Sequence, residues 1–182
     1  KINPNNLSDY SVLTFPSDSN HNSADDLVYS KKNNRIYVVF KVTSQITVSE
    51  VNPDTLAYTD VISDINFNNG DTITCDESFL YIPTFTDPTS ILKYSLVDFS
   101  LALSNTMTTQ TTAHSIRFDG ENLYMTGGGD DVLSTSWIAK VNPSDLTYTV
   151  AYFLSTESPT DDLTFAGDYV YIGVETTNYG LF

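Results

Sequence analysis

Three aspartates and one histidine stand at the start of four similar short runs of sequence. The runs read DDLVYS, DTITCD, HSIRFD and DDLTFA, and their first residues are Asp25, Asp71, His114 and Asp161. If the four runs lie around one axis, these side chains meet at one rim. Ca²⁺ is bound by several oxygen ligands, so the pattern predicts a calcium site. The alternative is that these short polar residues cap the starts of strands by hydrogen bonding to nearby backbone.

A second candidate for calcium is the stretch DSNHNSADD. Asp18, Asn20 and Asn22 follow the D-x-N-x-N spacing of calcium loops. The glycine expected at the sixth position is Ser23, and no glutamate follows at the twelfth. The stretch therefore fits either an irregular calcium loop or a polar connection, because connecting loops are rich in Asn, Asp and Ser.

Nucleophilic catalysis has little support in the sequence. There is no G-x-S-x-G motif, and the only two histidines are His21 and His114. The His and Cys spacing of zinc sites is absent as well. A metal-dependent hydrolase or lactonase would have to use the acidic quartet at the strand starts, so this reading depends on the same calcium site.

The runs that carry the quartet belong to a longer repeat. A tyrosine follows each run, in NRIYVVF, SFLYIPTF, ENLYMTGG and DYVYIGVE. These tyrosines are Tyr37, Tyr81, Tyr124 and Tyr171, at spacings of 44, 43 and 47 residues. A leucine after an Asn-Pro phrase, or after the degenerate phrase SLVDFSL, recurs as Leu7, Leu56, Leu101 and Leu146. We expect the tyrosines to pack between units and Asn-Pro to mark a turn, because repeated positions usually encode packing.

Each unit reads as four short strands with alternating apolar and polar residues, separated by Gly, Asn, Asp and Pro. Four strands in about 45 residues are typical of a β-propeller blade. The sequence therefore predicts an all-β protein, in which residues 1–182 form a single propeller domain of four blades with four antiparallel strands each.

The start of the chain matches the third strand of a unit. Lys1 and Pro4 align with Lys140 and Pro143, and the segment through Phe15 continues as a fourth strand. We therefore expect the N-terminal strand to complete the last blade and remove a free sheet edge. Two alternatives remain. The four units are part of a longer propeller, or the N-terminal strand completes a neighbouring molecule and links subunits into filaments.

Two phrases of one unit, DGENLYMTGG and WIAKVNPSDL, together resemble a bacterial extracellular β-propeller repeat known as SBBP, and another unit resembles the related YVTN type. The first SBBP phrase is matched by Asp119, Gly120, Asn122, Leu123, Tyr124 and Gly127. The second is matched by Ile138, Ala139, Lys140, Val141, Pro143 and Ser144. The repeat departs from the pattern where Asp145 replaces a glycine, and the unit IYVVFKVTSQITVSEVNPDTL is the YVTN-like one. The resemblance implies a propeller that is extracellular or at the cell surface, and it names no activity.

Charge narrows the set of partners. The chain has 23 acids and 8 bases, for a net charge of −15. Nucleic acid is excluded as a partner, because phosphate contacts need clustered Lys and Arg. No apolar run approaches the length of about 18 residues that a membrane span needs, so membrane insertion is not expected.

Three classes of function are predicted. The first is a non-enzymatic extracellular scaffold, namely a surface, adhesive or filament subunit that contacts proteins, glycans or other copies of itself. The second is a propeller that binds calcium or a small ligand or glycan at the acidic rim, and the third is a metal-dependent hydrolase or lactonase that uses the same rim. Tyr-rich outer strands such as LTYTVAYF favour contact surfaces, because tyrosine gives large contact area at small entropic cost.

Overall fold

The computed structural model confirms an all-β propeller. It describes residues 1–3, 5–21, 23–42, 44–67, 69–110, 112–128, 136–152 and 157–176, and all sixteen elements in this part of the chain are strands. None of the described segments is a helix that could cross a membrane.

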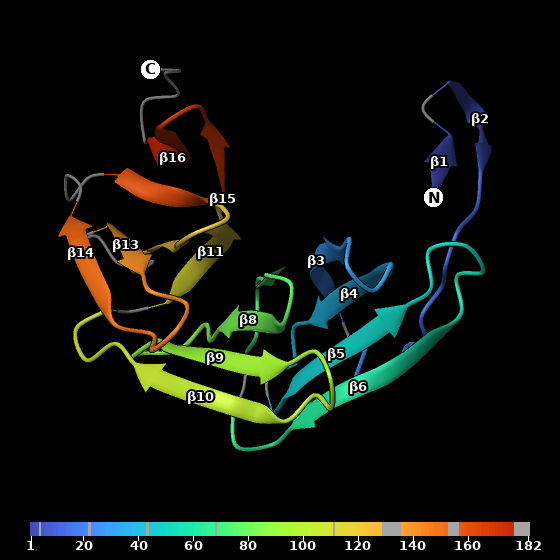
Figure 1. The fold of residues 1–182 in the computed structure, drawn as a ribbon, viewed down its shortest axis with the longest axis horizontal. Helices are drawn as coiled ribbons and strands as arrows, with labels where there is room; N and C mark the ends of the chain where they lie inside the picture. The colour runs from blue at the N-terminus through green and yellow to red at the C-terminus, as the bar shows by residue number, and fades with distance from the viewer. Residues whose placement is uncertain are drawn as a thin grey trace.

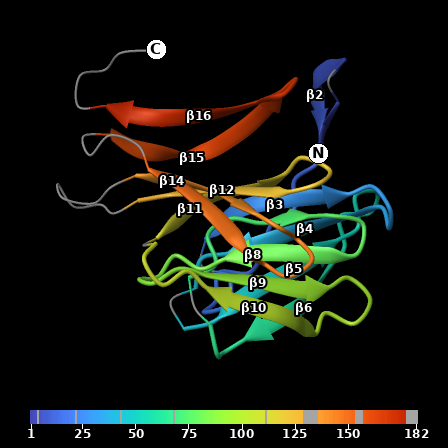
Figure 2. The same cartoon turned by 60° about the vertical axis from the view of Figure 1, so that its left-hand side comes forward.

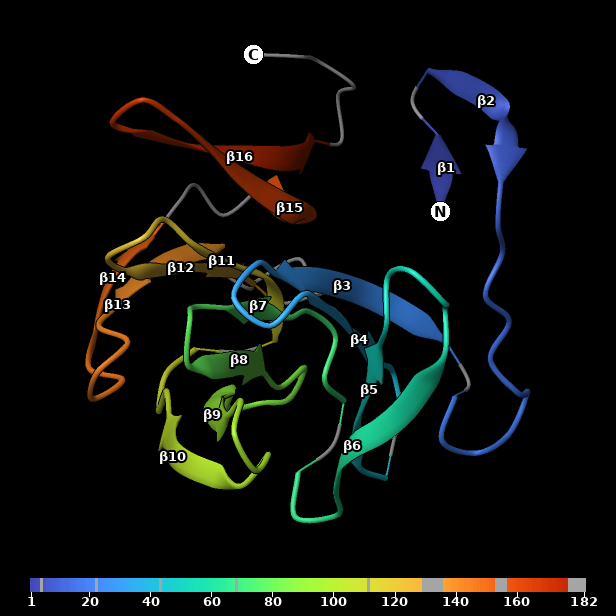
Figure 3. The same ribbon diagram turned by 45° about the vertical axis from the view of Figure 1, so that its right-hand side comes forward.

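Three antiparallel sheets of four strands each follow one another along the chain and form an arc (Figure 1). Blade 1 comprises β3 (Ala24–Ser30), β4 (Arg35–Phe40), β5 (Ile46–Val51) and β6 (Tyr58–Asp64). Blade 2 comprises β7 (Thr74–Cys75), β8 (Phe79–Pro83), β9 (Ser90–Ser95) and β10 (Leu101–Thr106). Blade 3 comprises β11 (Ala113–Phe118), β12 (Leu123–Gly127), β13 (Trp137–Val141) and β14 (Tyr148–Tyr152). The first strands lie toward the middle of the arc, and β6, β10 and β14 lie outside (Figure 3).

The fourth repeat contributes β15 (Glu157–Ala166) and β16 (Tyr169–Thr176), which pair with each other. This hairpin, here called blade 4, packs over blade 3 (Figure 2). The ring centroids of Tyr124 and Phe165 lie 5.5 Å apart in this contact. Leu163 is buried in the same contact zone. The fourth unit is thus placed by the same kind of sheet-on-sheet contact as the others, with two strands among the described residues.

The core lies between blades. Strand alternation sends one set of side chains to each face of a sheet, and the two faces of blade 2 enter two different clusters. One cluster joins blades 1 and 2: Tyr37, Val39, Ile46, Val48, Ile62, Ile73, Leu80, Ile82, Leu92 and Tyr94. The other joins blades 2 and 3: Tyr81, Ile91, Met107, Ala113, Ile116, Leu123, Met125, Trp137, Ala139, Val141 and Leu146. Both faces of blade 2 therefore contribute side chains to a buried cluster.

Two of the four repeated tyrosines are buried between blades, as the sequence predicts, whereas Tyr171 is 54% exposed. Tyr37 and Tyr81 are fully buried between blades. Their hydroxyls donate to carboxylates, that of Tyr37 to Glu50 at 3.1 Å and that of Tyr81 to Asp76 at 2.7 Å. Burial and the acceptor carboxylate together raise the pKa of Tyr81 well above its usual value. Each ring therefore buries apolar area while its polar end keeps a partner.

The Asn-Pro phrases form the turn between the third and fourth strands. In blade 3 the Asn142 side chain accepts hydrogen bonds from the backbone amide of Ser144 at 3.0 Å and from its hydroxyl at 2.8 Å. Leu146 closes the turn in the left-handed region at φ 59°, and Leu56 does the same in blade 1 at φ 58°. In blade 2 the residue in this conformation is Phe99, at φ 55°. The choice of Leu101 as the repeat position is therefore wrong by two residues.

The predicted completion of the last blade by the N-terminal strand is not what the described residues show. β1 (Ile2–Asn3) pairs with β2 (Asn6–Tyr10) as a separate two-stranded sheet, and β16 pairs with β15 alone. The physical reason is local: residues 11–21 are held against blade 1. There the Phe15 ring lies 4.8 Å from the rings of both Phe40 and Tyr58. The β1–β2 hairpin lies apart from blade 4 in Figures 1 and 3.

The turn geometry predicts the effect of removing one side chain. Asn142→Ala should lower the free energy of unfolding by about 1 kcal/mol, because two hydrogen bonds to the amide oxygen disappear. Asn142→Asp keeps an acceptor oxygen, so its free energy of unfolding should be close to that of the parent protein. Urea unfolding followed by Trp fluorescence measures both, and equal losses in the two variants would contradict the role given to that oxygen.

Candidate functional site

The starts of the first strands surround a pocket of about 380 Å³ near the axis of the arc. Its lining residues are Asp25, Asp26, Lys41, Asp71, Thr72, Phe85, His114, Arg117 and Asp162. Three of the four residues predicted for the rim, Asp25, Asp71 and His114, therefore come together. The fourth, Asp161, is part of β15, and its side chain lies outside the described residues. Repeat position alone thus located a pocket formed by four separate parts of the chain.

Arg117 connects three blades at one side of this pocket. Its two Nη atoms lie 2.9 Å from carboxylate oxygens, one on Asp26 of blade 1 and one on Asp162 of blade 4. Asp26 also accepts from the Thr72 hydroxyl at 2.7 Å and from the Ile73 amide at 3.1 Å. The Asp26 carboxylate is thus well supplied with donors, and the network links neighbouring blades.

Asp25 and Asp71 form a closely spaced pair of carboxyl groups at the other side. The Lys41 ammonium lies 2.9 Å from Asp71 Oδ1. Asp25 accepts from the Ser23 hydroxyl at 3.0 Å. Loss of hydration, reinforced by the facing Asp71 carboxylate, raises the pKa of Asp25 above its ordinary value. The pair therefore favours a donor or a positive charge in front of it.

An aromatic ring and an imidazole complete the wall. The edge of the His114 ring meets Phe85, with centroids 5.3 Å apart, and His114 Nε2 lies 3.3 Å from the Gly128 carbonyl oxygen. The Lys41 ammonium lies 4.6 Å from the centre of the Phe85 ring, a cation–π distance. The pocket thus combines acceptors, donors and a flat apolar surface.

The two cations were missed by sequence reasoning. Lys41 and Arg117 lie outside the repeated acidic position, Lys41 just after β4 and Arg117 within β11. A signal for them was present in the sequence, because basic residues are rare in this chain, with 8 in all. Arg117 also belongs to HSIRFD, one of the four runs that begin with the predicted rim residues. Among the described side chains, no three His, Cys, Asp or Glu are arranged to hold a metal ion. The calcium site that includes Asp161 stays a prediction.

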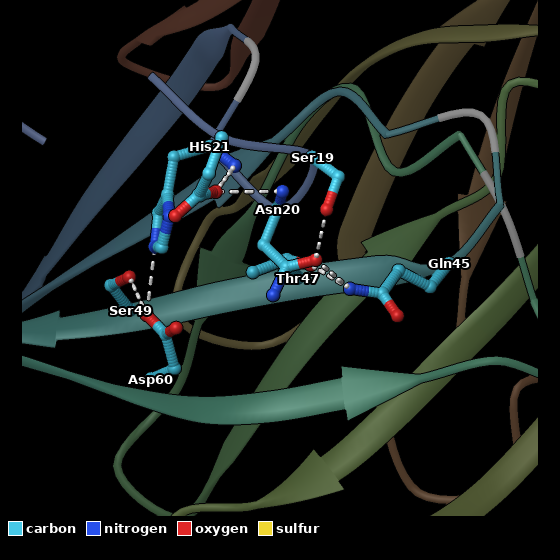
Figure 4. Close-up of polar contacts among 8 residues, drawn as sticks. Ser19, Asn20, His21, Gln45, Thr47, Ser49 and Asp60 are labelled. Carbon is cyan, nitrogen blue, oxygen red and sulfur yellow. Dashed lines mark hydrogen bonds and ion pairs between the residues drawn. The ribbon is translucent and has the colours of Figure 1, made fainter. Parts of the chain in front are cut away.

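The second predicted calcium stretch forms a hydrogen-bonded turn (Figure 4). Asp18 Oδ1 accepts from the backbone amides of Asn20 at 2.8 Å and His21 at 3.0 Å. Asn20 Oδ1 accepts from the Gln45 side chain at 3.0 Å. Asn22 lies outside the described residues. The oxygens of Asp18 and Asn20 thus have donors from the protein itself, as the alternative of a polar connection predicts.

His21 holds this turn on blade 1 (Figure 4). Its Nδ1 lies 2.9 Å from Asp18 and its Nε2 lies 3.0 Å from Asp60. Both ring nitrogens face carboxylate oxygens, which only accept when ionised, so the arrangement favours the imidazolium form. Burial alone lowers the pKa of His21, but the hydrogen bonds to Asp60 and Asp18 outweigh it, and the pKa lies above 6.5.

Comparison with known proteins supports the fold but does not assign the chain to a family. No protein-family model matches the chain, and no curated protein matches it. Solved structures do match. Hydrazine synthase of Kuenenia stuttgartiensis superposes with a TM-score of 0.59 at 11% identity, over 85% of this chain and 46% of that one.

Two further solved structures also superpose on this chain at low sequence identity. A chain of the nidogen/laminin complex superposes with a TM-score of 0.57 at 15% identity, over 77% of this chain and 51% of its own. TolB from Acinetobacter baumannii has a TM-score of 0.51 at 11% identity, over 86% and 41%. The chain therefore spans about half the length of the structures that it matches. At these identities the likeness shows a β-propeller fold alone.

The raised pKa of Asp25 gives a pH-dependent prediction. The Asp25 carboxyl group loses its proton near pH 3.8 in the unfolded chain and at higher pH in the folded chain. The stabilisation that the protonated carboxyl group provides is therefore lost as pH rises through its pKa in the folded chain. Asp25→Asn should therefore raise the free energy of unfolding at neutral pH and lose this advantage in acid. Urea unfolding at several pH values tests this, with Asp54→Asn on an exposed turn as control. An advantage that persists in acid would contradict it.

His21 gives a second pH-dependent prediction, in which the protonated form of the side chain is the charged one. Because its folded pKa is raised, its stabilisation is complete below pH 6.5 and is lost as pH rises through the folded value. We expect His21→Gln to remove this alkaline loss, so that the melting temperatures of parent and variant converge as pH rises. Thermal unfolding between about pH 6 and 9 measures this. Parallel curves for the two proteins would rule out the imidazolium between Asp18 and Asp60.

Proposed function

We propose that the chain is a non-enzymatic binding module whose axial pocket takes a small, neutral, polyhydroxylated ligand such as the end of a glycan. The observation that carries this proposal is the mixed lining of one pocket, in which carboxylates, an ammonium, a guanidinium, an imidazole and a phenyl ring face the same space. A volume of about 380 Å³ lies within the range of small-ligand pockets.

The charge of the pocket favours a neutral ligand over an anion or a metal ion. The lining holds four aspartates against one lysine and one arginine, so it repels anions. Two of the four carboxylates already face Arg117, and Asp71 faces Lys41. A cation would have to compete with these internal partners. Hydroxyl groups avoid this competition, because they donate to carboxylates and accept from cations at once.

The positions of these groups suit a sugar ring. Asp25 and Asp71 offer acceptor oxygens to the pocket, and Arg117, paired with Asp162, offers donors to the same space. Phe85 adds an apolar surface, against which the C–H face of a sugar can pack. Most of these side chains are fixed by ion pairs or ring contacts, which lowers the entropic cost of binding.

This proposal joins the first two function classes that the sequence predicts. A propeller that holds a glycan end at its axis would act as a surface or adhesive protein, through glycan contacts. We place this function outside the cell, where the strongly acidic composition, with a net charge of −15, favours solubility.

A saccharide titration tests the proposal. A panel of neutral mono- and disaccharides is added to isotopically labelled protein, and NMR shifts of pocket residues are followed. We expect at least one sugar to bind. Asp25→Ala should lower the affinity for that sugar by about tenfold, because a charged hydrogen-bond acceptor is lost. Asp54→Ala, on an exposed turn outside the pocket, is the matched control. No binding by any sugar, or equal binding by Asp25→Ala, would contradict the proposal.

A further inference from the structure

One side chain of each first strand packs against the preceding blade, with a single exception. The runs DTITCD, HSIRFD and DDLTFA place Ile73, Ile116 and Leu163 at equivalent positions, and these side chains are exposed by at most 2%. In the run DDLVYS the same position is Leu27, which is 61% exposed. Blade 1 thus presents to solvent the side chain that its successors bury.

The tyrosines of the second strands show the reverse pattern at the other end of the arc. Tyr37 and Tyr81 are fully buried against the following blade, and Tyr124 contacts Phe165 of blade 4. Tyr171 occupies the same repeat position in β16 and is 54% exposed. Its neighbour on the same face, Tyr169, is exposed as well.

The two exposed surfaces are therefore the two halves of an interface that the chain forms three times within itself. Leu27 and Tyr29 form one half, on β3, and Tyr171 and Tyr169 form the other, on β16. These two strands belong to the blades at opposite ends of the arc (Figure 3). Exposed apolar side chains that gather on one face mark contact surfaces.

The strand count adds a second, independent argument. Blade 4 has two strands among the described residues, and β1–β2 is a two-stranded sheet at the other end of the chain. The sequence from Lys1 aligns with the third strand and the following turn of blade 3, beginning at Lys140. Blade 4 thus carries the first half of a repeat, and β1–β2 carries a second half.

Charge makes the two ends complementary. The turn after β3 carries Lys31 and Lys32, both exposed. The β15–β16 hairpin carries five acids and no base, including the exposed Asp168 in its turn. Within the chain, Lys31 and Lys32 already share a pocket with Asp76 and Glu77 in the corresponding turn of blade 2.

We propose that a second copy of this chain docks at these ends, so that β16 of one copy packs against β3 of the other. The contact occurs twice around a two-fold axis and closes two arcs into one ring. The β1–β2 hairpin of each copy then adds to the edge of its partner's β16 that has no paired strand among the described residues.

This arrangement uses surfaces that the single chain leaves uncovered. Phe15 and Leu13 cover only the outer part of the blade 1 face, over Phe40 and Tyr58. Leu27 lies on the inner strand and stays exposed beside them. Because the two-fold axis pairs the β3 surface of each copy with the β16 surface of the other, the closed ring leaves neither surface exposed.

Sedimentation velocity gives the first test. The parent protein should sediment at twice the mass of one chain, and Leu27→Glu and Tyr171→Glu should each shift it to the mass of one chain. Val97→Glu is the control, because Val97 is 91% exposed but lies on the turn between β9 and β10. Circular dichroism checks that each variant keeps its strands. A parent that is monomeric at every concentration, or an open-ended polymer, would overturn the proposal.

Cross-linking distinguishes a second copy from closure within one chain. In a Cys75→Ser background, Leu27→Cys protein is mixed with Tyr171→Cys protein and treated with a short bis-maleimide. We expect a covalent dimer in the mixture and none in either protein alone. The doubly substituted chain should likewise give dimers. An internally cross-linked monomer, or a mixture without dimer, would show that the ring closes within one chain or not at all, and would overturn the proposal.

Discussion

Packing between neighbouring sheets is the interaction on which the rest of this structure depends. A single four-stranded sheet has two faces, and alternation gives each face its own apolar residues. Ile73 on one face of blade 2 reaches the cluster with blade 1, and Tyr81 on the other face reaches the cluster with blade 3. Burying one such aliphatic side chain is worth about 1.5–3 kcal/mol, so each blade is stabilised chiefly by the blades beside it.

The same packing creates the axial pocket. Because the blades stack side by side, the starts of their first strands converge, and Asp25, Asp71 and His114 approach one another from three blades. Uncompensated, such a gathering of acids would be costly. Arg117 and Lys41 offset the charge, and Arg117 does so by joining carboxylates of blades 1 and 4. The polar centre of the site is therefore also a link between the blades.

Repetition made the fold and most of the rim predictable from sequence. The tyrosines at Tyr37 and Tyr81 and the turn asparagine Asn142 have the roles that their recurrence indicates. Features that do not recur were missed. Lys41 and Arg117 each occur once, and nothing in their spacing pairs them with distant acids. Leu101 was misplaced because Ser95 and Phe99 replace Asn and Leu in that turn, where hydrogen bonding outweighs residue identity. The path of the N-terminal segment depends on ring contacts of Phe15, which no repeat encodes.

Hydrogen exchange of backbone amides tests most directly the claim that each blade is stabilised by its neighbours. The measurement is made at a concentration at which chains are separate, so that only internal blade contacts remain. The account predicts the slowest exchange in β8 and β9 of blade 2, whose two faces are both covered. It predicts much faster exchange in β15–β16, which has a neighbour on one face. Equal protection of blade 4 and blade 2 would contradict it.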